Sequence, residues 1–437
     1  MTKKALLAIG AVVLCSACGA PSLRYKYEVN KLASQGNFGQ AADYVNAKAK
    51  NNYGKRDVLL YELDLGALLH DAQDFAQSDI LFASAQQHIT DSYTKSVSAS
   101  AARFVINDLT TPYYAANYET ALTFFYRAMN FLQQNDIMSA GVEARKAVFF
   151  LDHLRADKKS GYNDDPFVQY MASLIFESTG ELSDARIART NALNAYAKHG
   201  WTKPNFSVPS NWQDYAEVII LHYVGKIPLK KSQTIQLAWH RALILADSPV
   251  EGESPIAPEV ENAISAGLTG SAVTVAYPVL ESQPYHITGS SAVIGGQRFA
   301  MQKMTDVSEL VEQDLREKLP GIWFRLATRA VLKRVAAVQA RHAVDGSGSE
   351  SDRYGSSGWL AEMAVSLLSA ATEKADTRQW FTLPAQIYMT RAFVPPGTQN
   401  IQLLLTDSNG NIIKQHTFEN VTVPKAGRVF LHHRTAY

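Results

Sequence analysis

Four short turns of similar sequence divide the first half of the chain, and they constrain its fold more than any other feature. The turns are residues 35–38, 72–75, 134–137 and 179–182. Each turn ends in an apolar residue, which is followed three places later by a small one: Ala41, Ser78, Ala140 and Ala185. Antiparallel helices approach to about 8–10 Å only where the contacting side chains are small. Because apolar residues also recur here at helical spacing, the sequence predicts paired antiparallel helices between residues 23 and 196.

This pattern resembles the tetratricopeptide repeat, whose two helices pack closely where small residues face each other. The last residues of the turns are 37, 62 and 45 positions apart, whereas the family has a period of about 34. The resemblance implies a solenoid over residues 18–200 that binds extended peptides on its concave face. Tyr118, Phe124 and Phe125 are candidates for such a peptide groove. The alternative is a plain helical bundle with these aromatic side chains in its core.

The first residues have the layout of a secretory signal peptide. Lys3 and Lys4 precede a short apolar run over residues 5–14, and two small residues at 16–17 lead into Cys18. The apolar run is shorter than the ~20 residues of a membrane-spanning helix. The ending resembles a bacterial lipobox. This resemblance implies removal of residues 1–17 and acylation of Cys18 as the first residue of the mature protein.

The residues around the cysteine set the expected location. Gly19 follows Cys18, where an aspartate would resemble the signal for retention in the inner membrane. By this analogy we expect a lipid anchor in the outer membrane, on the periplasmic side. Cys15 departs from the family pattern, in which leucine is usual three places before the acylated cysteine. The alternative is an ordinary secretory signal. Without Cys15 and with Cys18 acylated, no disulfide can form, so the fold must depend on its apolar cores.

Composition and motifs bound the function. The 437 residues include 42 Lys and Arg against 41 Asp and Glu, so the basic excess typical of nucleic-acid binding is missing. The sequence has no Gly-x-Ser-x-Gly elbow, phosphate-binding loop, Gly-x-Gly-x-x-Gly or His-Glu-x-x-His motif. We therefore predict no catalytic residue, no metal and no cofactor, and a protein that is not an enzyme. The length predicts more than one domain.

The composition changes at Trp201, where proline, β-branched and aromatic residues replace alanine. A β-rich segment is predicted over 201–305, with strands at 217–223, 234–237, 272–280 and 291–301. A helical segment is predicted over 306–375. Its parts are a helix over 306–342 that Pro320 breaks or kinks, a flexible Gly- and Ser-rich linker over 345–358, and an amphipathic helix over 359–375.

The last part of the chain is predicted to be a small antiparallel β segment over 376–437. Strands are expected at 385–392, 401–405, 412–418 and 428–432, with Asn409-Gly410 in a hairpin turn. Four short strands bury little surface alone, so we expect them to pair with the strands of 201–305. The predicted fold is multidomain α+β, with a helical-repeat domain followed by a β-rich domain that carries two long helices.

Three groups of polar residues are candidate sites. Arg325, Arg329 and Lys333 are spaced by four and form one basic stripe, which suits an anionic lipid or an acidic partner; the alternative is a solvated helix face. His432-His433 is predicted to be structural, because neighbours on a strand point to opposite faces. The acidic residues 164–165 are predicted to form a solvated turn, because a calcium site needs more oxygen ligands.

The chain as a whole resembles bacterial outer-membrane lipoproteins with a tetratricopeptide-like front half and a β-rich tail. Residues 375–384, followed by Pro395-Pro396-Gly397, carry this likeness most clearly. The resemblance implies a membrane-tethered scaffold that binds cell-envelope proteins and forms homo- or hetero-oligomers. One alternative is a structural subunit of a larger envelope complex. Another is an enzyme acting on cell-wall glycan or peptide, with two acids brought about 5–9.5 Å apart from distant segments.

Overall fold

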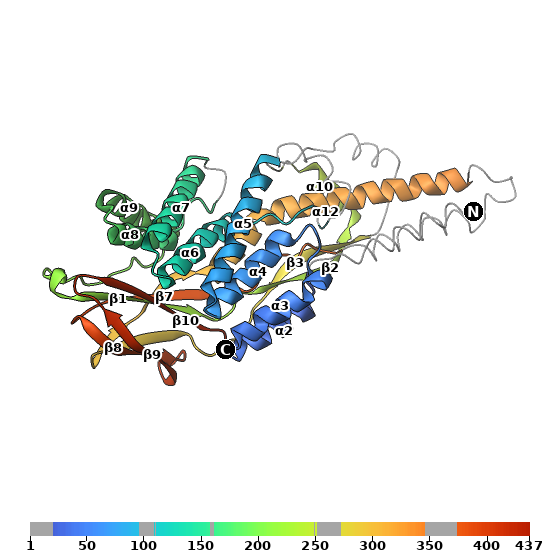
Figure 1. Ribbon diagram of the computed structural model, residues 1–437. Coiled ribbons are helices and arrows are strands. Elements are labelled where there is room, and N and C mark those ends of the chain that lie inside the picture. Colours follow the sequence, from blue (N-terminus) through green and yellow to red (C-terminus); the bar gives the residue numbers. More distant parts are fainter. Residues whose placement is uncertain are drawn as a thin grey trace.

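The computed structural model is an α+β protein in which helices occupy the first half and strands dominate the second (Figure 1). It describes residues 21–95, 109, 111–157, 161–248, 250, 272–345 and 374–437. The predicted signal peptide with Cys18 lies outside the described residues. Nearly all of the predicted linker and of the helix expected over 359–375 lie outside them as well.

Eight of the described helices form four antiparallel pairs, and the two helices of each pair meet at one of the four predicted turns. The pairs are α2 (Leu23–Ser34) with α3 (Phe38–Asn52), α4 (Val58–Asp71) with α5 (Phe75–Lys95), α6 (Asn117–Gln133) with α7 (Ile137–Asp157), and α8 (Pro166–Thr179) with α9 (Leu182–His199). Each helix packs against the next one along the chain. The four small residues that follow the turns are buried, as close helix packing requires.

The four turns share one backbone conformation. In each, the second residue has a positive φ: Gly36 (78°), Gln73 (67°), Asn135 (60°) and Gly180 (84°). The amide of the following residue donates to the carbonyl oxygen five residues earlier, as in Asn37 to Leu32 and Glu181 to Phe176. This is the hydrogen bond of a Schellman cap. The similarity of the turn sequences thus reflects one repeated way of ending a helix and starting its partner.

Sheet A has the strand order β10-β1-β7-β6, and sheet C has the order β5-β4-β8-β9. The strands of sheet A are β1 (Ala216–Val224), β6 (Gln302–Asp306), β7 (Gln386–Val394) and β10 (Arg428–Thr435). Those of sheet C are β4 (Gly289–Ile294), β5 (Gln297–Ala300), β8 (Gly397–Thr406) and β9 (Ile412–Val423). Each sheet therefore joins strands from both strand-rich stretches, the pairing that the short C-terminal strands required.

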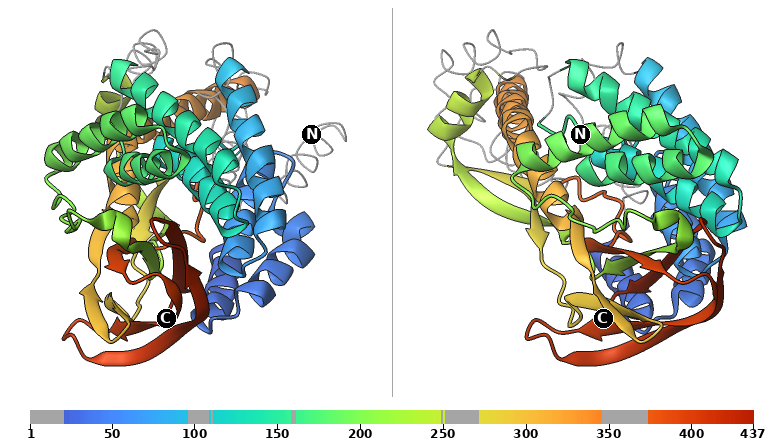
Figure 2. Two further views of the ribbon diagram at one scale, coloured as in Figure 1. Left: turned by 60° about the vertical axis from the view of Figure 1, so that its left-hand side comes forward. Right: turned by 90° about the vertical axis from the view of Figure 1, so that its left-hand side faces the viewer.

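Sheet A is the middle layer, with the helices on one face and sheet C on the other (Figure 2). In β1, Ile219 and Leu221 belong to the hydrophobic core shared with the helices, whereas Val218 and Ile220 belong to the core between the sheets. A strand that is buried on both faces needs apolar residues at consecutive positions, which explains its uninterrupted run. The largest hydrophobic core is thus shared by the helices and sheet A and crosses the boundary predicted at residue 200.

A third part of the molecule projects from these layers. It consists of the antiparallel pair β2 (Leu229–Ala238) and β3 (Ala272–Glu281) with α10 (Trp239–Asp247) and α12 (Val307–Asp345). Leu237, Trp239, Val275 and Leu326 are among the residues of its separate core. The 39 residues of α12 span about 58 Å, and its far end extends well beyond the sheets (Figure 1).

Three details differ from the sequence predictions. Residues 291–301 form two strands, β4 and β5, because Gly295 and Gly296 reverse the chain with positive φ. Pro320 lies inside α12 without ending it, so of the predicted break or kink the break is wrong; buried residues such as Leu315 and Phe324 on either side hold the helix against its neighbours. Finally, β10 is parallel to β1, because no hairpin connects the two strands or fixes their relative direction.

An extended stretch of chain, residues 374–385, runs between the helices and sheet A; we call it the central segment. Trp380, Phe381 and Leu383 are completely or almost completely buried. The Trp380 ring lies 5.6 Å from the rings of Phe82 and Tyr126. The inner surface of the helical array is therefore covered by the chain itself.

Two helix carboxylates bind the backbone of the central segment. Glu119 accepts a hydrogen bond from the Trp380 amide (3.1 Å), and Asp64 accepts one from the Phe381 amide (3.0 Å). Asp64 also accepts a hydrogen bond from the Tyr53 hydroxyl (2.9 Å). Burial raises the pKa of Asp64 well above its ordinary value, although the hydrogen bond from Tyr53 opposes the shift. The carboxylates thus supply acceptors for amides that would otherwise be buried without partners.

Charged groups fix the start of the central segment. Arg378 donates to Asp57 (3.0 Å) and to both carboxylate oxygens of Asp376. The buried Lys26 ammonium donates to the Thr377 carbonyl oxygen (2.6 Å). Burial lowers the pKa of Lys26 to about 8. The segment is therefore held by side chains from the first, second and third helix pairs.

We predict that Gln73→Gly stabilises the protein by about 1 kcal/mol, because a side chain in the left-handed region costs about that much. Gly180→Ala should destabilise it by a similar amount, although open space surrounds Gly180. Urea denaturation measures both effects. Gly39→Ala is the control, since this helical glycine has open space and no positive φ. A lower unfolding midpoint for Gln73→Gly would contradict the prediction.

We predict that Asp64→Asn lowers the free energy of unfolding by about 2 kcal/mol, because one buried donor loses its acceptor. The exposed Asp43 on α3 provides the matched control, Asp43→Asn, for which we expect little change. Chemical denaturation of both variants checks the prediction, and equal midpoints for the two would refute it.

Candidate functional site

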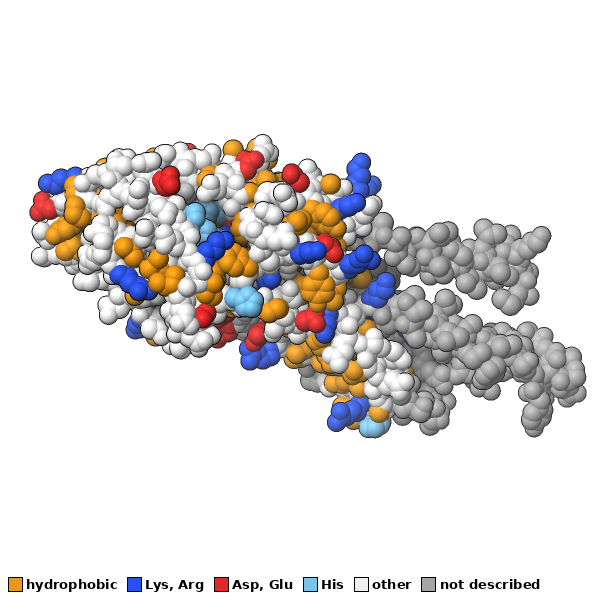
Figure 3. Space-filling view, turned by 90° about the horizontal axis from the view of Figure 1, so that it is seen from below, with side chains coloured by type: hydrophobic (Ala, Val, Ile, Leu, Met, Phe, Trp, Pro, Cys, Tyr) orange, Lys and Arg blue, Asp and Glu red, His pale blue; other side chains and the backbone are white. Residues whose placement is uncertain are grey.

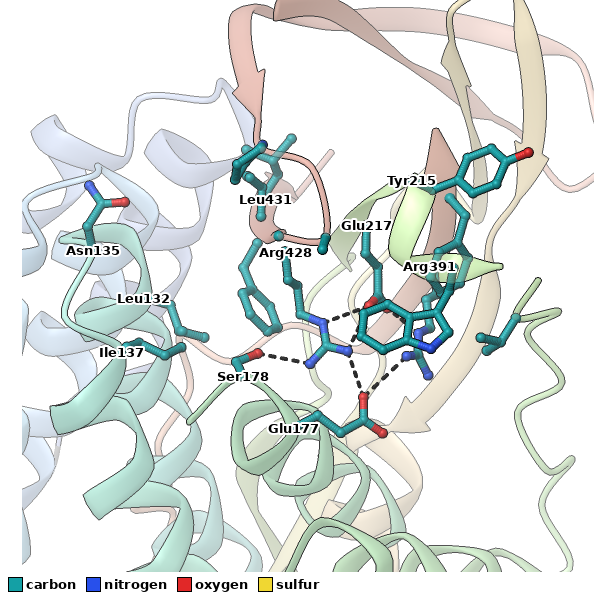
Figure 4. A pocket seen from close by; sticks show the side chains of 18 of the residues that line it. Leu132, Asn135, Ile137, Glu177, Ser178, Tyr215, Glu217, Arg391, Arg428 and Leu431 are labelled. Atoms are coloured by element: carbon teal, nitrogen blue, oxygen red, sulfur yellow. Dashed lines mark hydrogen bonds and ion pairs between the residues drawn. The ribbon is translucent and has the colours of Figure 1, made fainter. Parts of the chain in front are cut away.

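A groove of about 870 Å³ lies where the ends of the third and fourth helix pairs meet sheet A (Figure 4). Its walls come from the α6–α7 turn, the α8–α9 turn, the loop before β1, and the start of β10. The apolar lining includes Leu132, Ile137, Leu182, Trp212, Phe393 and Phe430. Large apolar side chains are exposed at its rim, with 67% of Leu182, 47% of Val208 and 44% of Trp212 accessible.

The groove contains a network of arginine and glutamate side chains (Figure 4). Arg428 Nη2 lies 2.6 Å from Glu177 and 2.7 Å from Glu217. Arg391 binds the same two carboxylates, through Nε to Glu217 and through Nη2 to Glu177 (3.2 Å). Arg189 completes the network by binding Glu177 (2.9 Å). Each carboxylate is therefore shared by at least two guanidinium groups.

The strand register of sheet A brings the network together. Glu217 is the second residue of β1, where it pairs directly with Arg428 of the parallel strand β10. Arg391 of β7 pairs with Ile219, two residues along β1, so its side chain is on the same face as that of Glu217. Burial disfavours the charge of Arg391, but attraction and hydrogen bonding by Glu217 raise its pKa above the ordinary value. The network keeps ionised groups at the junction of helices and sheet.

The three residues predicted to line a peptide groove lie in the hydrophobic core or pack against it. Tyr118 and Phe125 are buried, and Phe125 packs against Phe167 with ring centroids 4.8 Å apart. Phe124 is half-buried against Phe150. Burial leaves Tyr118 and Phe125 little surface for a peptide, whereas a peptide contact at the half-buried Phe124 stays a prediction. The alternative of a core position is correct for Tyr118 and Phe125.

Two of the three residues of the basic stripe on α12 line a second cavity. Arg325 and Arg329 line this cavity of about 330 Å³, together with Lys230 and Lys318. Arg329 is buried, whereas Arg325 and Lys333 are half-buried. Binding of an anionic partner to these three residues stays a prediction.

The two adjacent histidines point to opposite faces of β10, as the strand alternation predicts. His432 stacks on His70 from the helices, with ring centroids 4.4 Å apart. His433 stacks on His416 of sheet C (4.0 Å) and faces His222 (6.1 Å). Among the residues that the structure describes, no group of three or more His, Cys, Asp or Glu is placed to hold a metal ion.

The acidic residues 164–165 are buried, so the prediction of a solvated turn is wrong. Asp164 forms an ion pair with Arg155 (2.7 Å). Asp165 caps α8 by accepting a hydrogen bond from the Val168 amide (2.8 Å). Both carboxylates have structural partners, which explains why they can lie inside the protein.

Comparison with known proteins returned no match to a protein-family model and no significant similarity to a curated protein. Within the described part of the chain, every helix is too short or too polar to cross a bilayer.

Sequence reasoning missed the groove because its charged residues come from five separate segments. Glu177 and Arg189 lie on helices α8 and α9, whereas Glu217, Arg391 and Arg428 lie at the starts or in the middle of strands. The only local signal is a charged residue within an otherwise apolar strand, which is too common to indicate a site.

We predict that His433→Phe makes the protein less sensitive to acid. Burial and the neighbouring His416, Lys414 and Arg434 lower the pKa of His433 to about 3. The unfolded chain therefore binds more protons below its ordinary pKa of about 6.5, so stability is lost as pH falls through this range. Relative to the original protein, the variant should gain about 2 kcal/mol between pH 7 and pH 5. Urea denaturation at both pH values measures this gain, and parallel pH profiles would contradict it.

Proposed function

We propose that this protein is a scaffold of the bacterial cell envelope, anchored through acylated Cys18 to the periplasmic side of the outer membrane. In this proposal the four helix pairs are tetratricopeptide-like repeats, supported by their common Schellman turns and by the buried small residue after each turn. A partner protein binds at the groove between the repeats and sheet A. The anchor is supported by the signal-like N-terminus.

The exposed apolar rim of the groove is the observation that carries this proposal. Exposed apolar patches bordered by polar residues mark interaction sites, and aromatic residues and arginine are enriched where proteins bind each other. The groove combines both features, with Trp212 at its rim and three arginines in its lining. By contrast, apolar groups on the face seen from below are scattered among charged ones (Figure 3).

The two groove carboxylates suit binding better than hydrolysis. A glycosidase needs one protonated acid and one available carboxylate. Glu177 and Glu217 are instead bridged by the same guanidinium group of Arg428. Both carboxylates are therefore occupied by structural ion pairs with arginine, and neither is free to act on a substrate.

Site-specific photocrosslinking in intact cells tests the interaction. A photoreactive amino acid at Trp212 is expected to form a discrete adduct whose second component mass spectrometry identifies as an envelope protein. The matched control is the same substitution at Ile244, an exposed apolar residue on α10. An adduct that contains only a second copy of this chain would favour a structural subunit. Equal adducts at both positions, or none at Trp212, would refute the proposal.

Metabolic labelling with an alkyne fatty acid tests the anchor. Label is expected in the outer-membrane fraction of cells that make the original protein, and Cys18→Ser should remove it. Unlabelled protein in the soluble fraction of the original strain would refute lipid anchoring.

A further inference from the structure

The lining of the groove has more positive than negative groups. Arg189, Arg391 and Arg428 face only Glu177 and Glu217, so one positive charge lacks a counterpart among the lining residues. Both oxygens of each carboxylate already accept from a guanidinium group. A third carboxylate would balance the charges of the groove.

Arg391 has a donor available for such a carboxylate. Its Nε and Nη2 bind Glu217 and Glu177, whereas its Nη1 has no hydrogen-bond partner among the described residues. Only 7% of the side chain is accessible, and its guanidinium lies 5.5 Å from the centre of the Phe393 ring. The group is therefore held in place before a ligand arrives, which reduces the entropy lost on binding.

The backbone of sheet A is less available for binding a partner than the arginine side chains of the groove. The carbonyl oxygen of Phe430, on the edge strand β10, already accepts a hydrogen bond from Gln133 (3.0 Å). A partner strand added at this position would compete with that bond. The groove also offers guanidinium groups instead of the backbone amides that commonly bind a terminal carboxylate. Recognition of a side-chain carboxylate is thus the better match.

We propose that the groove binds a segment of a partner protein in which one aspartate or glutamate is flanked by apolar residues. This inference rests on the proposed function. The apolar flanks pack against the rim formed by Leu182, Val208 and Trp212, and the carboxylate binds Arg391. Because only 7% of the Arg391 side chain is accessible, the charge pair is stronger than it would be on an open surface.

A peptide array tests the proposal directly. The probes are acetylated and amidated decapeptides with a central Asp or Asn, flanked by varied combinations of Leu, Phe, Trp and Ser. Affinity for the best Asp peptides is expected to exceed that for their Asn counterparts by at least tenfold. Equal affinities for the two sets, or no binding to either, would overturn the proposal.

The substitution Arg391→Lys distinguishes a role of Arg391 in binding the ligand from a role in stabilising the protein. It keeps the positive charge beside Glu217 but removes the planar guanidinium, whose Nη1 is the nitrogen available to a ligand carboxylate while Nε and Nη2 bind Glu217 and Glu177. We expect about tenfold weaker binding of Asp peptides and unchanged binding of Asn peptides. Arg186→Lys, at an exposed position on α9, is the control. Equal weakening for both peptide sets would indicate a merely structural effect and overturn the proposal.

A Trp212 crosslink without Asp preference would refute this inference alone, whereas loss of that crosslink would refute the proposed function.

Discussion

The fold depends on two helix carboxylates that bind the backbone of a segment far along the chain. Glu119 and Asp64 accept the amides of Trp380 and Phe381, which lie 261 and 317 residues later. Burying a carboxylate alone costs several kcal/mol, and burying an amide without a partner costs about 1–3 kcal/mol. The hydrogen bonds between the carboxylates and the amides offset the cost of burying both groups. The helices therefore depend on the second half of the chain for a satisfied interior.

This dependence also positions the groove. Residues 374–385 lead directly into β7, so fixing the central segment against the helices fixes the strand that carries Arg391. β7 pairs with β1, which carries Glu217, and β1 pairs with β10, which carries Arg428. The groove is thus formed where a rigid sheet meets the ends of two helix pairs. A change in the packing of the central segment would be transmitted to the arginine network through these strand pairs.

The sequence predicted the helical half well because its signals are local. Small residues and turn residues recur near one another, so helix ends and pairings follow from spacing. The doubly buried strand β1 was also recognisable from its continuous apolar run. The central segment and the groove were not predictable, because their partners are hundreds of residues apart. Asp64 and Glu119 in particular look like ordinary charged residues of solvated helix faces, and only the tertiary structure reveals that they are buried.

The buried path of the central segment has a consequence for biosynthesis. A ribosome synthesises the helices long before it completes residues 374–385. The central strand β1 is likewise synthesised well before its neighbours β7 and β10. Until then the inner aromatic surface of the helices has nothing to cover it. The helical half therefore cannot complete its hydrophobic core until residues 374–385 are available.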